Sequence, residues 1–439
     1  MKKFLLFFFI FFSSISPAFS VIIRDSEIEN FIKKIFSPIV KTTNQKAENL
    51  NINIINDNKI NAFVTPGQKI FIFTGLLLNS TSPNQIEGVL AHELGHITGK
   101  HHLKIYEQLE RARIINIVGM ILGGAATLAT GDPEALVAAT AATTGTTQRS
   151  LLSFSRIQEG AADQAGFTSL KKSNKSVCGI LHFLKFMESR EGLGIQNEYT
   201  RSHPLTKERI NDANNAAKNE DCSKIQNSKK EEDEFLFIQA KLHGFIDPTN
   251  TLKKIKNFER FNDDHKNYAL SIANYKLSNF KKGNELIDKI IKKYPMNPYF
   301  YELKAQMLRE NGYLNESLKY YKKTIKLIPD DSLILIELAQ IQINLDSNKH
   351  LAESIKNLNK ASRKETQNQK LWYLLSVAYG RDGMIGKSRY ASAHAAYYRG
   401  DDIAARNFIK MAKKIIKKNS REWKELENLE KDLKIKNKK

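Results

Sequence analysis

The chain has 439 residues and a formal net charge of +21, from 68 Lys and Arg against 47 Asp and Glu. This length exceeds that of one ordinary hydrophobic core, so we exclude a single core and predict two domains of roughly 200 residues each. A charge of this sign favours acidic protein surfaces or anionic lipid headgroups as partners.

Residues 1–20 have the pattern of a secretory signal peptide. Two lysines precede an apolar run from Phe4 to Phe12, and small residues follow at Ala18 and Ser20. The run is shorter than the ~20 residues that span a bilayer, which disfavours the alternative of an uncleaved anchor. Loss of the two lysines lowers the formal charge from +21 to +19. We therefore expect an exported protein and no nucleic-acid partner.

Short strands are predicted after an N-terminal helix. The segments 52–55, 61–64 and 70–73 are rich in Ile, Phe and Val, and a Pro-Gly pair supplies a turn between the last two. Together they predict a small sheet. Its edge near Phe63 is a candidate platform for substrate, because an extended peptide can add to a sheet edge through backbone hydrogen bonds.

The predicted helix over 82–102 carries the strongest chemical signal. His92 and His96 are four residues apart, so both imidazoles project from one helix face and can bind a single ion. Glu93 lies beside them and can accept a proton from water without being a ligand. This is the spacing of a zinc peptidase, in which zinc lowers the pKa of water and polarises the scissile carbonyl. We predict one Zn²⁺ per chain.

The stretch 114–147 is apolar and rich in Gly, Ala and Thr, with a Gly-Asp-Pro break at 131–133. Because its first part carries no charge, a transmembrane helix must be considered. Small residues and a marginal length favour instead a helical hairpin that lies at a membrane interface or over the active site. An ordinary buried core and a true span are the alternatives.

A catalytic zinc usually has three protein ligands, and two candidates compete for the third position. Glu159 and Asp163 are four residues apart in a predicted helix, so one carboxylate can bind zinc while the other orients a ligand imidazole. His102 instead completes a metzincin pattern with His96, in which a glycine turns the chain back to the metal. No convincing methionine turn follows, and the residues after His102 look like continued helix.

A charged run at 226–234 has no apolar period and marks a domain boundary. We predict a first domain over 21–225 and a second over 235–439, with the run as a linker. The second domain is helical and self-similar at about 34 residues, the period of tetratricopeptide repeats. Such helix pairs stack into a solenoid whose concave surface suits peptide or protein binding. The fold class is therefore α+β and mainly α.

The repeat pattern rests on residue types that recur at fixed positions. The prolines at 295 and 329 are 34 residues apart. Small, apolar, glycine and aromatic residues fill the expected positions at Ala305, Leu308, Gly312 and Tyr321, and again with a tryptophan at Trp372, Leu375, Tyr379 and Gly383.

Four segments carry a family resemblance. Asn61-Ala-Phe63, Gly88–His96, Ser155–Asp163 and Ser202-His-Pro-Leu205 resemble the zinc metallopeptidase family of HtpX and the CAAX prenyl proteases. Together with the export signal and the repeats, the chain looks like an exported member from the Gram-negative periplasm. The resemblance is specific in the peptidase motifs and architectural in the repeats, and it implies a zincin-like metallopeptidase domain.

The resemblance also implies roles for individual residues. His92, His96 and Glu159 would be the zinc ligands, Glu93 the general base and Asp163 a group that supports a ligand. It also implies a role for a histidine in the loop after the predicted helices.

His203 matches a loop histidine that approaches the metal in similar proteins. It would occupy the open position of the metal as a reversible block, and the alternative is a simple turn residue before Pro204.

The implied function is a secreted zinc metalloendopeptidase that degrades misassembled outer-membrane or periplasmic proteins and assists their assembly. The alternative is a repeat-based assembly factor or chaperone with a latched, largely silent peptidase. We expect polypeptide substrates, outer-membrane assembly machinery bound through the repeats, and peripheral membrane contact through 114–147. The expected location is the periplasm, at the periphery of the outer membrane. The cysteines, Cys178 and Cys222, can pair in that compartment, and the sequence leaves open whether they do.

Overall fold

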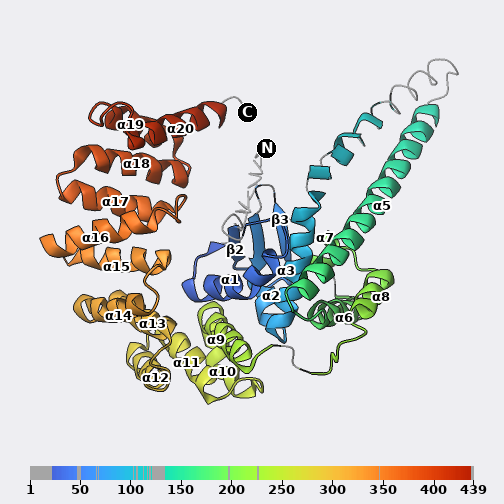
Figure 1. Ribbon diagram of the computed structural model, residues 1–439, viewed down its shortest axis with the longest axis horizontal. Coiled ribbons are helices and arrows are strands. Elements are labelled where there is room, and N and C mark those ends of the chain that lie inside the picture. The colour runs from blue at the N-terminus through green and yellow to red at the C-terminus, as the bar shows by residue number, and fades with distance from the viewer. Residues whose placement is uncertain are drawn as a thin grey trace, which may run out of the picture. The chain divides into compact units, whose positions relative to one another are not determined.

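The computed structural model describes residues 22–436, except 47–50, 66, 68, 102, 105–106, 112, 116, 118–119, 121–133, 196–197, 225–226 and 346. The described residues form two compact units (Figure 1). The sheet unit contains Ile39–Cys222 and the strand at Ile22–Ile23, and the repeat unit contains Arg24–Pro38 and the chain from Ser223 onward. The predicted signal peptide lies outside the described residues.

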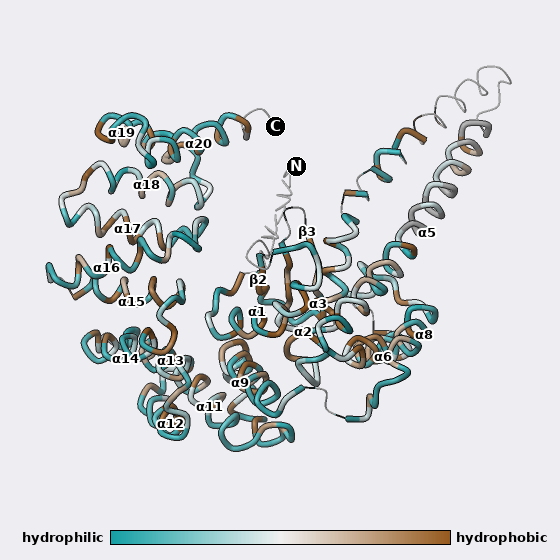
Figure 2. The backbone as a smooth tube through the Cα atoms, in the orientation of Figure 1, coloured by the Kyte–Doolittle hydropathy of each residue, from teal (hydrophilic) through white to brown (hydrophobic). Residues whose placement is uncertain are grey.

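The sheet unit is built around a four-stranded sheet in the order β1-β2-β4-β3. Its strands are β1 (Ile22–Ile23), β2 (Asn51–Ile55), β3 (Ala62–Thr65) and β4 (Lys69–Phe73). β2 and β4 run parallel, whereas β3 is antiparallel to β4 and β1 is antiparallel to β2. Figure 2 shows hydrophobic residues concentrated along these strands. The predicted small sheet is confirmed, β1 was not predicted, and β3 lies at an edge of the described sheet.

The sheet unit also contains helices. They are α2 (Thr74–Asn79), α3 (Pro83–Thr98), α5 (Glu134–Lys172), α6 (Cys178–Gly192), α7 (Glu198–Ser202) and α8 (Lys207–Ala216). Nearly all of α3 is buried, from Pro83 to Ile97. The predicted helix over 82–102 is too long at its end, because Lys100 adopts a left-handed φ of 52° after α3 has stopped at Thr98.

Close packing between α3 and α5 depends on a glycine. A Cβ added at Gly95 would lie 2.5 Å from the carbonyl oxygen of Ala162, so only glycine lets the two helices approach this closely. Ala162 lies between Glu159 and Asp163 in α5. The close approach therefore brings both carboxylates against the helix that carries His92.

A disulfide joins Cys178, at the start of α6, to Cys222, with their Cα atoms 5.3 Å apart. Next to it, the carboxylate of Glu220 accepts hydrogen bonds from the hydroxyl of Ser176 and the backbone N–H of Val177. These contacts tie the C-terminal end of the sheet unit to α6. The pairing that the sequence left open is present.

The apolar stretch 114–147 is only partly described. Residues 121–133 lie outside the described part of the chain, and α5 begins at Glu134. Several apolar side chains before the gap are about half exposed, among them Ile114, Ile115 and Met120. Within the described ranges, no helix combines the length and the apolar character needed to cross a membrane.

The repeat unit consists of helices that pair in sequence order. They are α9 (Lys229–Ile246), α10 (Pro248–Lys254), α11 (Asp263–Lys276), α12 (Phe280–Lys293), α13 (Pro298–Glu310), α14 (Leu314–Leu327), α15 (Ser332–Asn344), α16 (Asn348–Ala361), α17 (Gln369–Arg381), α18 (Ile385–Arg399), α19 (Asp402–Lys413) and α20 (Arg421–Lys436). Successive pairs stack on one another from α11 to α20 (Figure 1). The predicted tetratricopeptide-like architecture is confirmed.

Residues at equivalent positions of the repeat have the same structural role in different helix pairs. Gly312 and Gly383 adopt φ of 84° and 74° in the turns within the α13–α14 and α17–α18 pairs, a conformation that favours glycine. In both pairs a serine of the second helix donates a hydrogen bond to a backbone carbonyl of the first, from Ser317 at 2.6 Å and from Ser388 at 2.8 Å.

The predicted linker is helical over most of its length. α9 begins at Lys229, and Ser228 caps it by accepting a hydrogen bond from the backbone N–H of Glu231, whose side chain returns to Ser228. Because of this capping box, the charged run forms the first turns of a helix, although it has no apolar period that would predict one. The linker prediction is therefore wrong from Lys229 onward.

The N-terminal helix α1 (Ser26–Val40) belongs, up to Pro38, to the repeat unit. Asp331, at the start of α15, accepts a hydrogen bond at 2.6 Å from Asn30. Arg24, just before α1, pairs with Glu365 at 2.8 Å. The first helix of the predicted 21–225 domain thus folds together with the repeats.

Candidate metal centre

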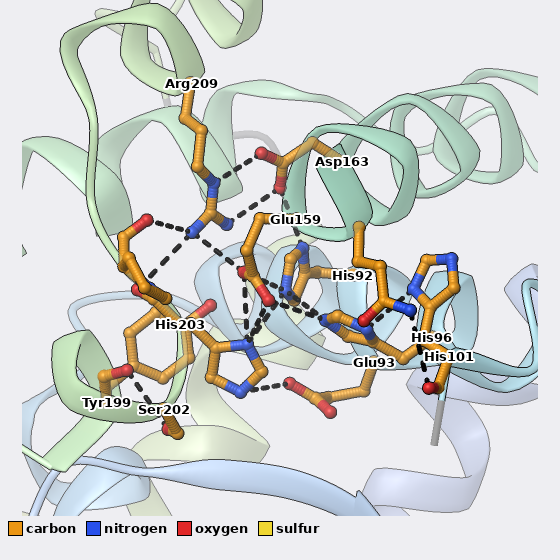
Figure 3. Close-up of polar contacts among 12 residues, drawn as sticks. His92, Glu93, His96, His101, Glu159, Asp163, Tyr199, Ser202, His203 and Arg209 are labelled. Atoms are coloured by element: carbon orange, nitrogen blue, oxygen red, sulfur yellow. Dashed lines mark hydrogen bonds and ion pairs between the residues drawn. The ribbon is translucent and has the colours of Figure 1, made fainter. Parts of the chain in front are cut away.

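Four side chains from separate parts of the sheet unit converge on one point (Figure 3). His92 and His96 come from α3, Glu159 from α5, and His203 from the loop after α7. One potential ligand atom from each lies within 4.8 Å of all the others, and all four side chains are buried. The structure brings together residues that are up to 111 positions apart in the sequence.

The ligand atoms face one another at short range. Nε2 of His92 lies 3.0 Å from Nε2 of His96, and the two oxygens of Glu159 lie 3.3 Å from these nitrogens. Lone pairs at such distances repel unless a proton or a cation lies between them. Two imidazoles and one carboxylate are a ligand set that suits zinc, so the residues fit the metal that the sequence predicts.

Asp163 fixes the orientation of His92. Its Oδ1 accepts a hydrogen bond at 2.7 Å from Nδ1 of His92, which leaves Nε2 of that ring facing the centre. The pKa of the Asp163 carboxyl is lowered, since His92 and Arg209 together outweigh the effect of burial. Asp163 is therefore ionised and holds the imidazole in one tautomer.

Arg209, in the first turn of α8, holds both carboxylates of α5. It contacts Asp163 at 2.6 Å and 3.0 Å and Oε2 of Glu159 at 3.0 Å, and it donates to the backbone carbonyl of Pro204 at 3.1 Å. The side chain is almost fully buried. Arg209 is not predictable from the sequence, because no spacing in the sequence ties it to α5.

His101 approaches His96 from the side away from the centre. Nδ1 of His101 lies 2.9 Å from Nδ1 of His96, so one ring donates and the other accepts. If Nε2 of His96 faces a metal, its Nδ1 carries the hydrogen and donates to His101. This contact is not predictable from the sequence either, because it depends on the chain reversal at Lys100.

Glu93 is the most isolated group of the centre. It is fully buried, and neither carboxylate oxygen has a hydrogen-bond partner among the described residues. Burial raises the pKa of Glu93, and His203, His92 and Arg209 oppose this effect. A buried carboxylate with free acceptor atoms and a raised pKa is suited to take up a proton from a reactant.

His203 lies between Glu93 and Glu159. Its Nε2 is 3.4 Å from Oε1 of Glu93, and its Nδ1 is 3.2 Å from both oxygens of Glu159. The ring stacks on Tyr199 of α7 with centroids 4.7 Å apart. The imidazole thus covers the space between the Glu93 carboxylate and the converging ligand atoms (Figure 3).

Electrostatic effects on the ligand atoms favour a bound cation. Burial opposes ionisation of Glu159, but His203, His92 and His96 outweigh it and lower the pKa of this carboxyl strongly. Burial lowers the pKa of His92, yet Asp163 and Glu159 together raise it to about 10. For His96 burial dominates and lowers the pKa to about 3. A metal at Nε2 of His92 would displace a proton from that ring.

Comparisons with known proteins agree with this centre. Residues 25–217 match the sequence model of a protein family described as "Peptidase family M48". The beta-barrel assembly-enhancing protease of Yersinia pestis is 21% identical over 387 residues, which cover 86% of this chain and 78% of that protein. The protein of the same name from Escherichia coli strain K12 is 27% identical over 224 residues, covering 51% of this chain and 45% of that protein.

Among solved structures, yeast Tom70 covers 82% of this chain and 66% of its own, with 13% sequence identity and a TM-score of 0.30. Such a score is too low to support a structural argument. The repeat architecture therefore rests on the helix pairs described above.

Proposed function

We propose that residues 25–217, which match peptidase family M48, form a zinc metalloendopeptidase, and that the chain cleaves misassembled outer-membrane or periplasmic proteins. The observation that carries the proposal is the buried convergence of His92, His96 and Glu159 beside Glu93, whose carboxylate accepts no hydrogen bond from the described residues. The kind of substrate is suggested by the relatives from Yersinia pestis and Escherichia coli, which are called beta-barrel assembly-enhancing proteases.

We assign the zinc ligands to His92, His96 and Glu159. Asp163 and His101 fix the two ring orientations through the opposite ring nitrogens, and Arg209 holds Glu159 from behind. A zinc ion supplies a Lewis acid that polarises the scissile carbonyl and makes water more acidic.

Glu93 acts as the general base in this proposal. Its carboxylate accepts a proton from the attacking water and later gives a proton to the leaving amine. Burial favours the protonated form, which helps Glu93 to hold the proton between these steps. Neither oxygen accepts a hydrogen bond from the described residues, so both are available for water once His203 leaves its position beside Oε1.

The edge of β3 that faces away from β4 in the described sheet is the proposed substrate platform. In an antiparallel pair of strands, hydrogen-bonded and non-hydrogen-bonded residue pairs alternate. Asn61 and Phe73 form a hydrogen-bonded pair, so the backbone N–H and C=O groups of Ala62 and Val64 point away from β4. Oδ1 of Asn61 is buried without a hydrogen-bond partner in the described part of the chain. These acceptors and donors are suited to an extended peptide.

His203 is the proposed latch. Its position between Glu93 and Glu159 blocks the place where a water and a carbonyl must meet. This favours a second candidate function, in which the repeats act as an assembly factor and the peptidase stays silent until the latch opens.

The remaining parts of the chain support export and recruitment. The basic repeats would bind the outer-membrane assembly machinery, the apolar stretch 114–147 would contact the membrane surface, and residues 1–20 would direct the chain to the periplasm.

The proposal is tested by casein cleavage and zinc content of the mature chain and its Glu93→Gln variant. We expect cleavage to fall by about 10²- to 10⁴-fold, as for loss of a general base, while one zinc per chain remains. Retained cleavage, or loss of zinc, would contradict the role of Glu93.

The latch is tested by His203→Ala, with His182→Ala as a control from an α6 histidine outside the centre. Faster cleavage by His203→Ala alone supports the latch, and unchanged or slower cleavage refutes it. If the Glu93→Gln chain still restores outer-membrane assembly in cells that lack the protein, the assembly factor becomes the better account.

A further inference from the structure

A pocket of about 430 Å³ opens in the sheet unit beside the N-terminal end of β3. Its volume lies within the range of about 300–1,000 Å³ that is usual for ligand sites. The connection from β2 to β3 supplies one wall, and α6 and α7 supply others. Its lining includes Asn58, Lys59, Ile60, Arg190, Glu198 and Arg201.

The pocket has an excess of positive charge. Lys59, Arg190 and Arg201 face a single carboxylate, Glu198, which contacts Lys59 at 3.1 Å and Arg201 at 3.3 Å. The Lys59 and Arg201 side chains are 51% and 69% exposed, so these ion pairs are weak and can be exchanged. A second carboxylate is therefore accommodated without breaking a strong contact.

Arg190 supplies an independent sign of a missing partner. Its Nε atom is buried, and no hydrogen-bond acceptor for it is found among the described residues. Buried donors of this kind are normally satisfied, so the side chain of Arg190, which lines the pocket, is suited to bind an acceptor from outside the chain. Among protein groups, a carboxylate matches the guanidinium fork best.

The pocket also lies on the path of a polypeptide at the β3 edge. A strand that pairs antiparallel with β3 leaves it at Ala62 and continues towards Ile60 and Lys59, which line the pocket. The other wall, α7, carries Tyr199 and leads directly to His203. An occupant is therefore more readily a residue of the bound polypeptide than a free metabolite.

We propose that this pocket is a specificity subsite that binds a carboxylate of the polypeptide substrate, either an Asp or Glu side chain or the C-terminus. This rests on the proposed peptidase function. The carboxylate forms an ion pair with Arg190. It also interacts with Lys59 and Arg201, which remain paired with Glu198. Substrates with an acidic residue beyond the β3 edge are consequently bound more tightly than their amide counterparts.

Peptide binding to the zinc-loaded, full-length Glu93→Gln chain tests the subsite. The probes are fluorescent ten-residue peptides of Val, Thr and Gln in which a single Glu replaces Gln at successive positions, each made with a free and an amidated C-terminus. We expect one position of Glu, or the free C-terminus, to improve the dissociation constant by about fivefold at low salt, as for partly exposed ion pairs. The gain should shrink in 0.5 M NaCl.

Arg201→Glu, added to the same chain, should abolish the preference, and Arg113→Glu should keep it. Arg113 is a matched control because its side chain is 72% exposed and, like Arg201, it pairs with a Glu three residues earlier. Equal binding of Glu and Gln peptides at every position and terminus, or a preference that survives Arg201→Glu, overturns the subsite. Because binding is read without cleavage, a wild-type chain that cuts no peptide would overturn the peptidase function separately.

Discussion

Two clusters of buried charge, one in each unit, contrast in how they are neutralised. In the repeat unit, Lys241 of α9 lies 2.7 Å from Asp25, 3.1 Å from Glu27 and 3.8 Å from Glu302. The ammonium group comes from the chain itself, and it joins α1 to the repeats. In the sheet unit, Arg209 lies behind the carboxylates of α5, and the ligand atoms in front of them face each other.

The contrast distinguishes a structural cluster from a functional one. A buried cluster that contains its own counter-ion needs no further partner, and its acidic groups are held against the lysine. A cluster whose lone pairs converge requires a cation from solution, and the adjacent Glu93 accepts no hydrogen bond from the part of the chain that the structure describes. Buried charge alone therefore does not mark a site, whereas converging lone pairs with an unpartnered base do.

The largest effect is expected from breaking the structural cluster. Lys241→Met leaves buried carboxylates without their counter-ion and should destabilise the repeat unit by about 3–5 kcal/mol. Both tryptophans, Trp372 and Trp423, lie in this unit, so their fluorescence during urea unfolding reports on it. Zinc content should not change, since the metal centre lies in the other unit.

Lys34→Met is the matched control, because this lysine also pairs with a carboxylate, Glu234, but is 45% exposed. Its effect should be below about 1 kcal/mol. Equal destabilisation by the two variants would mean that burial of Lys241 has no special importance.

A smaller effect is expected from loosening the metal centre. Asp163→Asn weakens the hold on His92 and should lower zinc affinity by about 10- to 100-fold, measured by competition with a chelating dye. Glu188→Gln removes an exposed carboxylate of α6 and should leave the affinity unchanged. An unaltered affinity in Asp163→Asn would remove its assigned orienting role.

The pH dependence of stability sharpens the comparison further. Burial raises the pKa of Glu302 from 4.5 to about 8, because the effect of burial exceeds that of Lys241. The folded chain then binds a proton that the unfolded chain has released, so this contribution to stability is complete below pH 4.5 and is lost as pH rises through 8.

Between pH 6 and pH 7, the free energy of unfolding should fall by about 1 kcal/mol less in Glu302→Gln than in the wild type. Urea unfolding of both chains at the two pH values measures this, and the difference between them cancels the other titrating groups. Parallel pH profiles would show that Glu302 is already ionised in the folded chain.

The smallest effect is expected at His101. His101→Phe removes the acceptor for Nδ1 of His96 and should weaken zinc binding by about fivefold, the value of one neutral hydrogen bond. His182→Phe, in α6, provides the control. A chain that loses no affinity on His101→Phe would show that the orientation of His96 is set by packing alone.

The sequence predicted those parts of the centre that depend on helix geometry. His92 and His96, like Glu159 and Asp163, are four residues apart, and such pairs share a helix face in any context. Arg209 and His101 could not be predicted, because their contacts arise from the packing of α8 on α5 and from the turn after α3.

The fold shows the same division. Strands, repeat helices and their turns follow from local patterns, whereas the assignment of α1 to the repeats depends on contacts such as Arg24 with Glu365, 341 positions apart. Cys178 and Cys222 could be paired only once the fold set their Cα separation. The charged run after Ser228 forms a helix that its pattern does not predict, because a capping box can begin a helix before any apolar period appears.

The central claim is that Glu159 completes a zinc site with His92 and His96. Zinc per chain, measured by mass spectrometry on the purified wild type, Glu159→Ala and His102→Ala chains, tests it most directly. We predict one zinc in the wild type and in His102→Ala, and none in Glu159→Ala. Zinc retained by Glu159→Ala and lost by His102→Ala would contradict the account and favour the metzincin arrangement.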